Sequence, residues 1–139
     1  MQPHILAIDD EEDIREMLQQ LLTFKGYRVS VAANADQARR VVQADPPHLI
    51  ISDLQMEDTD GLVLVEELHQ KLPEVPILLL TGVVFDPEVV RENLRKKVTS
   101  YLDKTTSLEG IVAEIRRLLG EGKAGPAAET PVRPAARST

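Results

Sequence analysis

The 139-residue chain contains no cysteine and no tryptophan, and aromatic residues make up only 3% of it. The absence of cysteine excludes disulfide bonds, cysteine-ligated zinc and thiol catalysis. With so few aromatic side chains available, any core must be built mainly from leucine, isoleucine, valine and alanine.

Long apolar runs and excess positive charge are also missing. No run approaches the ~18 residues of a membrane helix, and no basic-then-apolar leader precedes the first apolar run, so we expect a cytoplasmic protein without a membrane partner. The formal net charge is −7. Because a nucleic-acid contact usually needs a basic face that neutralises phosphates, we expect no direct binding to DNA or RNA.

Apolar residues nevertheless make up 42% of the chain, which is enough for one domain with a core. They form short runs, and several of these, such as the run at 4–8, lack polar alternation, a pattern typical of strands buried on both faces. These runs predict five strands, at 4–8, 27–31, 49–51, 77–80 and 99–102.

A helical pattern follows each predicted strand. The first stripe, which includes Ile14, Leu18 and Leu22, ends before Gly26. Asn34 is expected to cap the second helix with Gln37 as its reciprocal partner, and Thr106 with Glu109 to cap the fifth. The apolar face predicted for the third helix consists of Leu62, Val65, Leu68 and Leu72. An Asp-Pro-Glu start predicts a fourth helix from Asp86 to about Lys97.

Five alternations of strand and helix predict an α/β fold of three layers, with a parallel sheet between two layers of helices. We expect residues 1–119 to form this domain. From Gly120 onward the composition shifts to glycine, alanine, proline and threonine, which predicts a disordered tail or linker stub over 120–139.

Polar residues stand where the predicted strands end. Asp9 and Asp10 follow the first strand, Asp53 the third, Thr81 the fourth and Lys104 the fifth. Because ligands of open parallel sheets bind outside the carboxyl ends of the strands, we expect these groups to converge. Carboxylates that lie close together repel one another, so either the pKa of one of them rises or the group binds a cation. A ligand set made only of oxygen atoms favours Mg²⁺. With a lysine and a threonine beside it, such a site suits a phosphoryl group on Asp53.

With these residues in this order, the sequence resembles the receiver domains of bacterial two-component response regulators, across about residues 3–119. The segments that carry the resemblance stand in order, each at a predicted strand end. They are Ile-Leu-Ala-Ile-Asp9-Asp10, Ile-Ile-Ser-Asp53-Leu-Gln-Met56 with Gly61, Leu-Leu-Leu-Thr81-Gly82, and Tyr101-Leu-Asp-Lys104. The resemblance implies a flavodoxin-like sheet in the strand order 2-1-3-4-5.

The resemblance also implies a role for each of these residues. Asp53 would accept a phosphoryl group from a histidine kinase or phosphotransfer protein. Asp10 would ligate Mg²⁺ directly, Asp9 mostly through water, and Asp53 and the Gln55 carbonyl would complete the site. The phosphoryl-binding residues would be Thr81, Gly82 and Lys104. Thr81 and Tyr101 would form a switch that changes the surface of the fourth helix, fifth strand and fifth helix, where an output partner or a second copy binds. The domain would catalyse only its own phosphorylation and dephosphorylation, and so would not be an enzyme in the usual sense.

Two residues depart from the family pattern, in which a proline usually follows both Met56 and Lys104; here Glu57 and Thr105 stand there. These departures leave open an unphosphorylated receiver-like docking module. An aspartyl-phosphate phosphatase of the haloacid-dehalogenase class is a second alternative. Its chemistry calls for two acids spaced two apart after the first strand, and here Asp9 is followed two residues later by Glu11.

Overall fold

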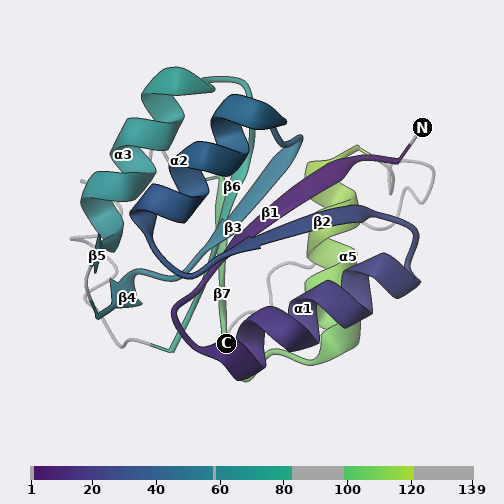
Figure 1. Cartoon of the computed structure of the whole chain (residues 1–139). Helices are drawn as coiled ribbons and strands as arrows, with labels where there is room; N and C mark the ends of the chain where they lie inside the picture. The colour runs from purple at the N-terminus through teal and green to yellow at the C-terminus, as the bar shows by residue number, and fades with distance from the viewer. Residues whose placement is uncertain (1, 58, 83–98, 121–139) are drawn as a thin grey trace.

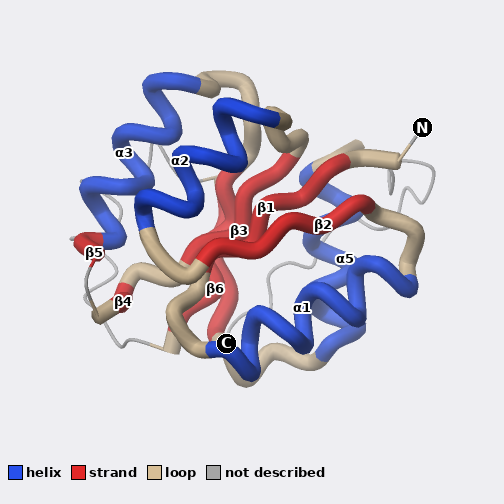
Figure 2. Tube along the Cα trace, in the orientation of Figure 1, coloured by secondary structure: helices blue, strands red, loops and turns tan. Residues whose placement is uncertain are grey.

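In a computed structural model of the chain, the described residues are 2–57, 59–82 and 99–120. Five parallel strands form the central sheet (Figures 1 and 2). They are β1 (His4–Ile8), β2 (Arg28–Ala32), β3 (Leu49–Ser52), β6 (Ile77–Thr81) and β7 (Ser100–Asp103). Their order is β2-β1-β3-β6-β7, which is 2-1-3-4-5 when the five are counted along the chain, so the predicted order is confirmed.

Helices cover both faces of this sheet (Figure 1). On one face lie α1 (Glu12–Phe24) and α5 (Leu108–Leu118), and on the other α2 (Ala35–Ala44) and α3 (Gly61–Lys71). Successive side chains of a strand point to opposite faces, and β1 shows this clearly. Ile5 and Ala7 pack in the α1/α5 core, whereas Leu6 and Ile8 pack in the α2/α3 core. The predicted fourth helix lies outside the described residues.

Helix α2 begins as predicted, with one difference of detail. Asn34 Oδ1 accepts the Gln37 N–H at 2.9 Å. The Gln37 side chain reaches back to the N–H of Ala33, at 2.7 Å, rather than to that of Asn34.

The predicted cap of the fifth helix was wrong by one residue. Ser107 caps α5, and its Oγ accepts the Gly110 N–H at 3.0 Å. Thr106 stays in the preceding turn because its own N–H donates to the Asp103 carbonyl.

The predicted apolar face of α3 was wrong at Leu62, which is 42% exposed. Asp60 caps this helix by accepting the N–H groups of Leu62 and Val63, which fixes its start at Gly61. From that start the inward positions fall at Gly61, Leu64, Val65 and Leu68.

A short antiparallel hairpin follows β3, in a segment where the sequence pattern predicts no strand. It consists of β4 (Gln55–Met56) and β5 (Thr59–Asp60). Its base packs so closely that a Cβ atom at Gly61 would lie 2.3 Å from the Leu54 carbonyl oxygen. Only glycine fits there without moving the backbone, which explains a glycine at the start of a helix.

Across the described parts of the chain, the helices are too short or too polar to cross a membrane.

Candidate functional site

The carboxyl ends of β1, β3, β6 and β7 bring their polar residues to one edge of the sheet. Asp9 follows β1, Asp53 follows β3, Thr81 ends β6 and Lys104 lies just past β7. Sheet-type hydrogen bonds continue into this edge and fix its backbone. The Asp53 N–H donates to the Ile8 carbonyl and the Lys104 N–H to that of Thr81, each at 3.1 Å.

Lys104 is the electrostatic centre of this edge. Its Nζ lies 2.8 Å from Asp53 Oδ2, 3.0 Å from Asp9 Oδ2 and 2.9 Å from Glu11 Oε2. Burial acts to lower the pKa of Lys104, but the hydrogen bonds to Asp53, Glu11 and Asp9 outweigh it and raise the pKa above its usual value. Lys104 therefore carries a positive charge throughout the physiological pH range.

Asp9 and Asp53 are almost completely buried. Each carboxylate accepts one backbone N–H from the loop that follows it. Asp9 Oδ1 accepts from Glu11 at 2.9 Å and Asp53 Oδ1 from Gln55 at 3.1 Å. Burial raises the pKa of Asp9, although the Glu11 N–H and Lys104 act in the opposite direction. The site therefore holds closely spaced negative charge that one lysine balances only in part.

The carboxylates can be tested as a set of metal ligands. Oxygen atoms of Asp9, Asp10, Glu11 and Asp53 all lie within 4.8 Å of one another. They are hard oxygen donors, with no sulfur or imidazole nitrogen among them, as Mg²⁺ prefers. Asp10 Oδ2 accepts the Glu57 N–H at 2.8 Å, so the loop after β3 contacts the loop after β1. The residues present fit a small divalent cation.

Other residues singled out from the sequence lie around this cluster. The Gly82 backbone passes Lys104, and a Cβ atom there would lie 3.9 Å from Lys104 Cδ. Thr81 is buried beside it at the end of β6. Tyr101 pairs with Leu79 in the β6–β7 register and is 52% exposed, so its ring is not enclosed in the cluster. In the described residues no peptide bond is cis, including the one between Lys104 and Thr105.

The sequence reasoning missed Glu11. The sequence pattern gives Glu11 no role in the site, but in the structure it makes no side-chain cap at the start of α1 and its carboxylate binds Lys104. Sequence spacing alone carries no sign of this contact, because 93 positions separate the two residues.

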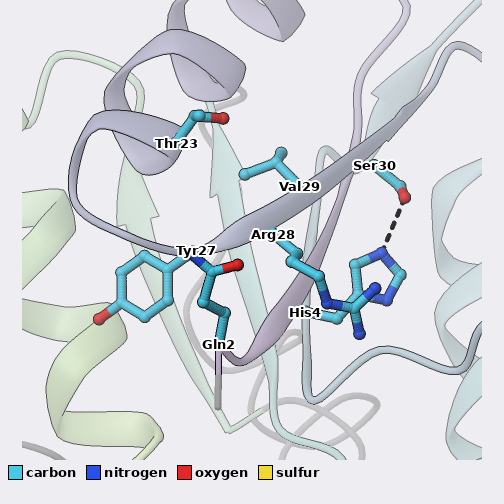
Figure 3. A pocket seen from close by; sticks show the side chains of 7 residues that line it. All are labelled: Gln2, His4, Thr23, Tyr27, Arg28, Val29 and Ser30. Atoms are coloured by element: carbon cyan, nitrogen blue, oxygen red, sulfur yellow. Dashed lines mark hydrogen bonds between the residues drawn. The ribbon is translucent and has the colours of Figure 1, made fainter.

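A pocket of about 430 Å³ lies at the opposite, amino edge of the sheet (Figure 3). Its lining residues are Gln2, His4, Thr23, Tyr27, Arg28, Val29 and Ser30. His4 is buried; its Nε2 is 2.7 Å from Ser30 Oγ, and its Nδ1 makes no hydrogen bond but lies 3.7 Å from Asp45 Oδ2. None of the residues predicted to form the functional site lines this pocket.

The five-stranded sheet with an acidic cluster and a lysine at its carboxyl edge defines an α/β protein of the flavodoxin-like fold. The family model described as the response regulator receiver domain matches residues 5–116. The chain therefore belongs to the receiver-domain family of response regulators, the phosphoacceptor signalling domains of two-component systems.

Curated relatives agree with this assignment. Response regulator MprA of Mycobacterium leprae is 36% identical over 133 residues, which cover 91% of this chain and 55% of the relative. Response regulator MprA of Mycobacterium tuberculosis is 34% identical over 137 residues, covering 94% of this chain and 56% of the relative. The chain thus spans about half the length of these relatives.

Solved structures match the fold. Chemotaxis protein CheY4 of Vibrio cholerae superposes with a TM-score of 0.77 at 29% identity, covering 85% of this chain and 99% of that one. A CheY-like receiver domain protein of Methanospirillum hungatei gives 0.80 at 25% identity, covering 89% and 98%. NtrX of Brucella abortus gives 0.79 at 26% identity, and the match covers 89% of this chain but only 28% of NtrX.

Proposed function

We propose that the domain accepts a phosphoryl group on Asp53 from the phosphohistidine of a histidine kinase or phosphotransfer protein. A carboxylate oxygen of Asp53 would attack phosphorus, so that a P–O bond forms while the P–N bond breaks. The ring nitrogen would keep the electron pair of the P–N bond, and the proton already on the other ring nitrogen would make the leaving group a neutral imidazole. The observation that carries this proposal is the 2.8 Å contact between Asp53 Oδ2 and Lys104 Nζ at a buried sheet edge. It places a fixed positive charge beside the oxygen that would become phosphorylated.

Mg²⁺ would be held by Asp9, Asp10, Asp53 and the backbone carbonyl of Gln55. The clustering of the three carboxylates supports these assignments. The bound ion would supply positive charge that neutralises the oxygens of the transferring group. Lys104, the Thr81 hydroxyl and the Gly82 N–H would bind phosphoryl oxygens directly, since they border the same edge.

Phosphorylation would then change a surface that partners bind. Thr81 would move toward the new oxygens, and Tyr101 would follow. The affected surface would include β7 and α5 together with the segment that follows β6, and it would bind an output partner or a second copy of the chain. The fold matches NtrX over only 28% of that protein's length, which supports an arrangement in which a receiver is joined to further domains.

We propose further that residues 1–119 form the receiver domain, that 120–139 serve as a tail or linker, and that the protein works in the cytoplasm. The domain would act as a phosphoacceptor rather than as an enzyme for other substrates.

The test is phosphorylation by acetyl phosphate with Mg²⁺. The wild-type protein should gain one phosphoryl group that is stable to acid and labile to base, and Asp53→Asn should gain none because an amide is not a usable nucleophile. Asp103→Asn is a matched control, since this exposed carboxylate also stands at a strand end but binds Thr105 instead of Lys104. Phosphorylation of the Asp53→Asn protein would place the acceptor elsewhere. A wild-type protein that takes up no phosphoryl group would favour the docking module.

A further inference from the structure

We infer that the backbone amide of Glu57 positions the carboxylate of Asp10 for metal binding. The Glu57 N–H donates to Asp10 Oδ2 at 2.8 Å, although 47 residues separate the two. This inference rests on the proposed function, because it assigns Asp10 to a Mg²⁺ site.

The hairpin after β3 leaves this amide available. Gln55 pairs with Asp60 and Met56 pairs with Thr59, so Glu57 lies beyond the last pair of the ladder. The hairpin is also fixed at its base, where Gly61 packs against the Leu54 carbonyl. The Glu57 N–H is therefore outside the ladder of the hairpin, and it donates to one oxygen of Asp10 instead.

This bond has a consequence for the metal site. A carboxylate with one oxygen hydrogen-bonded has less freedom to rotate, so its other oxygen is held for a ligand. Groups that hydrogen-bond to a metal ligand typically change metal affinity 10–100-fold when they are removed. Among the described residues the Asp10 side chain makes no other hydrogen bond, so the Glu57 amide is its single anchor there.

The residue type at position 57 decides whether this anchor exists. Proline, which is usual there in the family that this chain resembles, has no N–H and cannot make the bond. The Glu57 side chain is not needed for it. The Glu57 amide therefore supports the Asp10 carboxylate, and this support does not depend on the negative charge of the Glu57 side chain.

The experiment compares two neutral variants. Glu57→Gln removes the charge and keeps the amide, whereas Glu57→Pro removes both. Met56 lies in strand β4, and this extended conformation is the one that a following proline requires. In Mg²⁺ titrations we expect Glu57→Gln to bind within about threefold of the wild type and Glu57→Pro to bind about tenfold or more weakly than Glu57→Gln.

Thermal unfolding with and without Mg²⁺ separates positioning from mere structural damage. A ligand that binds the folded state raises stability according to its affinity. Mg²⁺ should therefore raise the stability of the Glu57→Pro protein by less than it raises that of the Glu57→Gln protein. This difference does not depend on how stable the two proteins are when a chelator has removed Mg²⁺. Equal Mg²⁺ affinities of the two variants would overturn the inference and leave the proposed site intact. A wild-type protein that binds no Mg²⁺ would overturn the site itself.

Hydrogen exchange gives a second measurement that does not require the proline variant to fold. The Glu57 amide should exchange at least about tenfold faster in Asp10→Ala than in the wild type, without Mg²⁺, because its acceptor is gone. Unchanged exchange at Glu57 would show that the bond is not made in solution, and would also overturn the inference.

Discussion

Lys104 Nζ lies 2.9 Å from Oε2 of Glu11, a residue on the loop after β1. An ammonium group has three N–H donors, and here each has a carboxylate partner, in Asp9, Glu11 or Asp53. A phosphoryl oxygen must therefore displace one of these partners to reach Lys104. Glu11 is the easiest to displace, because its side chain is 60% exposed whereas those of Asp9 and Asp53 are 3% exposed.

Replacement of Glu11 by glutamine should therefore speed phosphorylation by acetyl phosphate. Exposed ion pairs contribute up to about 1 kcal/mol, which limits the increase to about fivefold. Glu12→Gln serves as the control, since Glu12 is also exposed and neighbours Glu11 but belongs to the first turn of α1. A rate that falls in Glu11→Gln would mean that Glu11 helps to bind the cation instead of competing for Lys104.

Loss of Lys104 should have two opposite effects. In Lys104→Gln without Mg²⁺, the buried carboxylates lose their counter-charge, and we expect the free energy of unfolding to fall by about 3–5 kcal/mol. Mg²⁺ should bind this variant more tightly than the wild type, because a neighbouring positive charge has been removed. Calorimetric titration and denaturant unfolding measure the two effects.

Lys71→Gln is the control for Lys104→Gln, since Lys71 pairs with Glu67 at 3.5 Å on an exposed helix face and its loss should cost less than about 0.5 kcal/mol. Weaker Mg²⁺ binding by Lys104→Gln would contradict the sharing of carboxylates between the lysine and the ion.

The sequence predicted the sheet and its polar edge well, for a physical reason. Buried parallel strands need continuous apolar runs, and these runs end where the chain meets solvent or a ligand, so Asp9, Asp53 and Lys104 mark the strand ends directly. The contacts of Glu11 and Glu57 were not predictable in this way. They join loops that are distant in sequence. From the sequence alone, each glutamate could equally well be a surface residue that contacts only water.

The helix details show the same limit. Leu62 fits an apolar helical stripe as well as Leu64 does, and only the exact starting residue of α3 decides which of them points inward. That start is set by the Asp60 cap, which is a local signal that the sequence itself carries, and by the close packing of Gly61 against Leu54, which it does not show.

The amino edge of the sheet should give a pH-dependent contribution to stability. Arg28 Nη1 donates to Asp45 Oδ2 at 2.7 Å, and this bond lowers the pKa of Asp45 below its usual 3.8, although burial opposes the shift. Because the folded state favours ionised Asp45, its contribution is present above pH 3.8 and is lost as the pH falls below that value toward the folded-state pKa.

Asp45→Asn should therefore be less stable than the wild type at neutral pH, by a margin that stays constant down to about pH 5 and closes at lower pH. Denaturant unfolding across this range measures the margin. In an Arg28→Gln background the same substitution should have a smaller effect, because the main cause of the shift is absent. A margin that is independent of pH would show that the ionised state of Asp45 is not what stabilises the fold.

The switch can be tested at Thr81, which is buried at the end of β6, while Tyr101 on the neighbouring strand is half exposed. In the β6–β7 register Leu79 pairs with Tyr101 and Thr81 with Asp103, so Thr81 and Tyr101 are diagonal neighbours on one face of the sheet. Phosphorylation adds about −1.5 to −2 charges at Asp53. A hydroxyl that donates to the new oxygens must move toward them, and this movement leaves space beside it for the Tyr101 ring.

A ligand shifts an equilibrium only through its different affinities for the two states, so the Thr81 contact must form mainly in the phosphorylated one. Thr81→Ala should still accept a phosphoryl group at Asp53 but show much smaller amide shift changes along β7 when beryllofluoride, a phosphoryl mimic, is added. Thr81→Ser should restore them, because it keeps the hydroxyl. Thr99→Val is the control: Thr99 lies just before the amino end of β7, and its hydroxyl accepts the Ile77 N–H far from the site. A wild-type pattern of shifts around Tyr101 in the Thr81→Ala protein would disprove the coupling, whereas the assignment of Asp53 as phosphoacceptor would be unaffected.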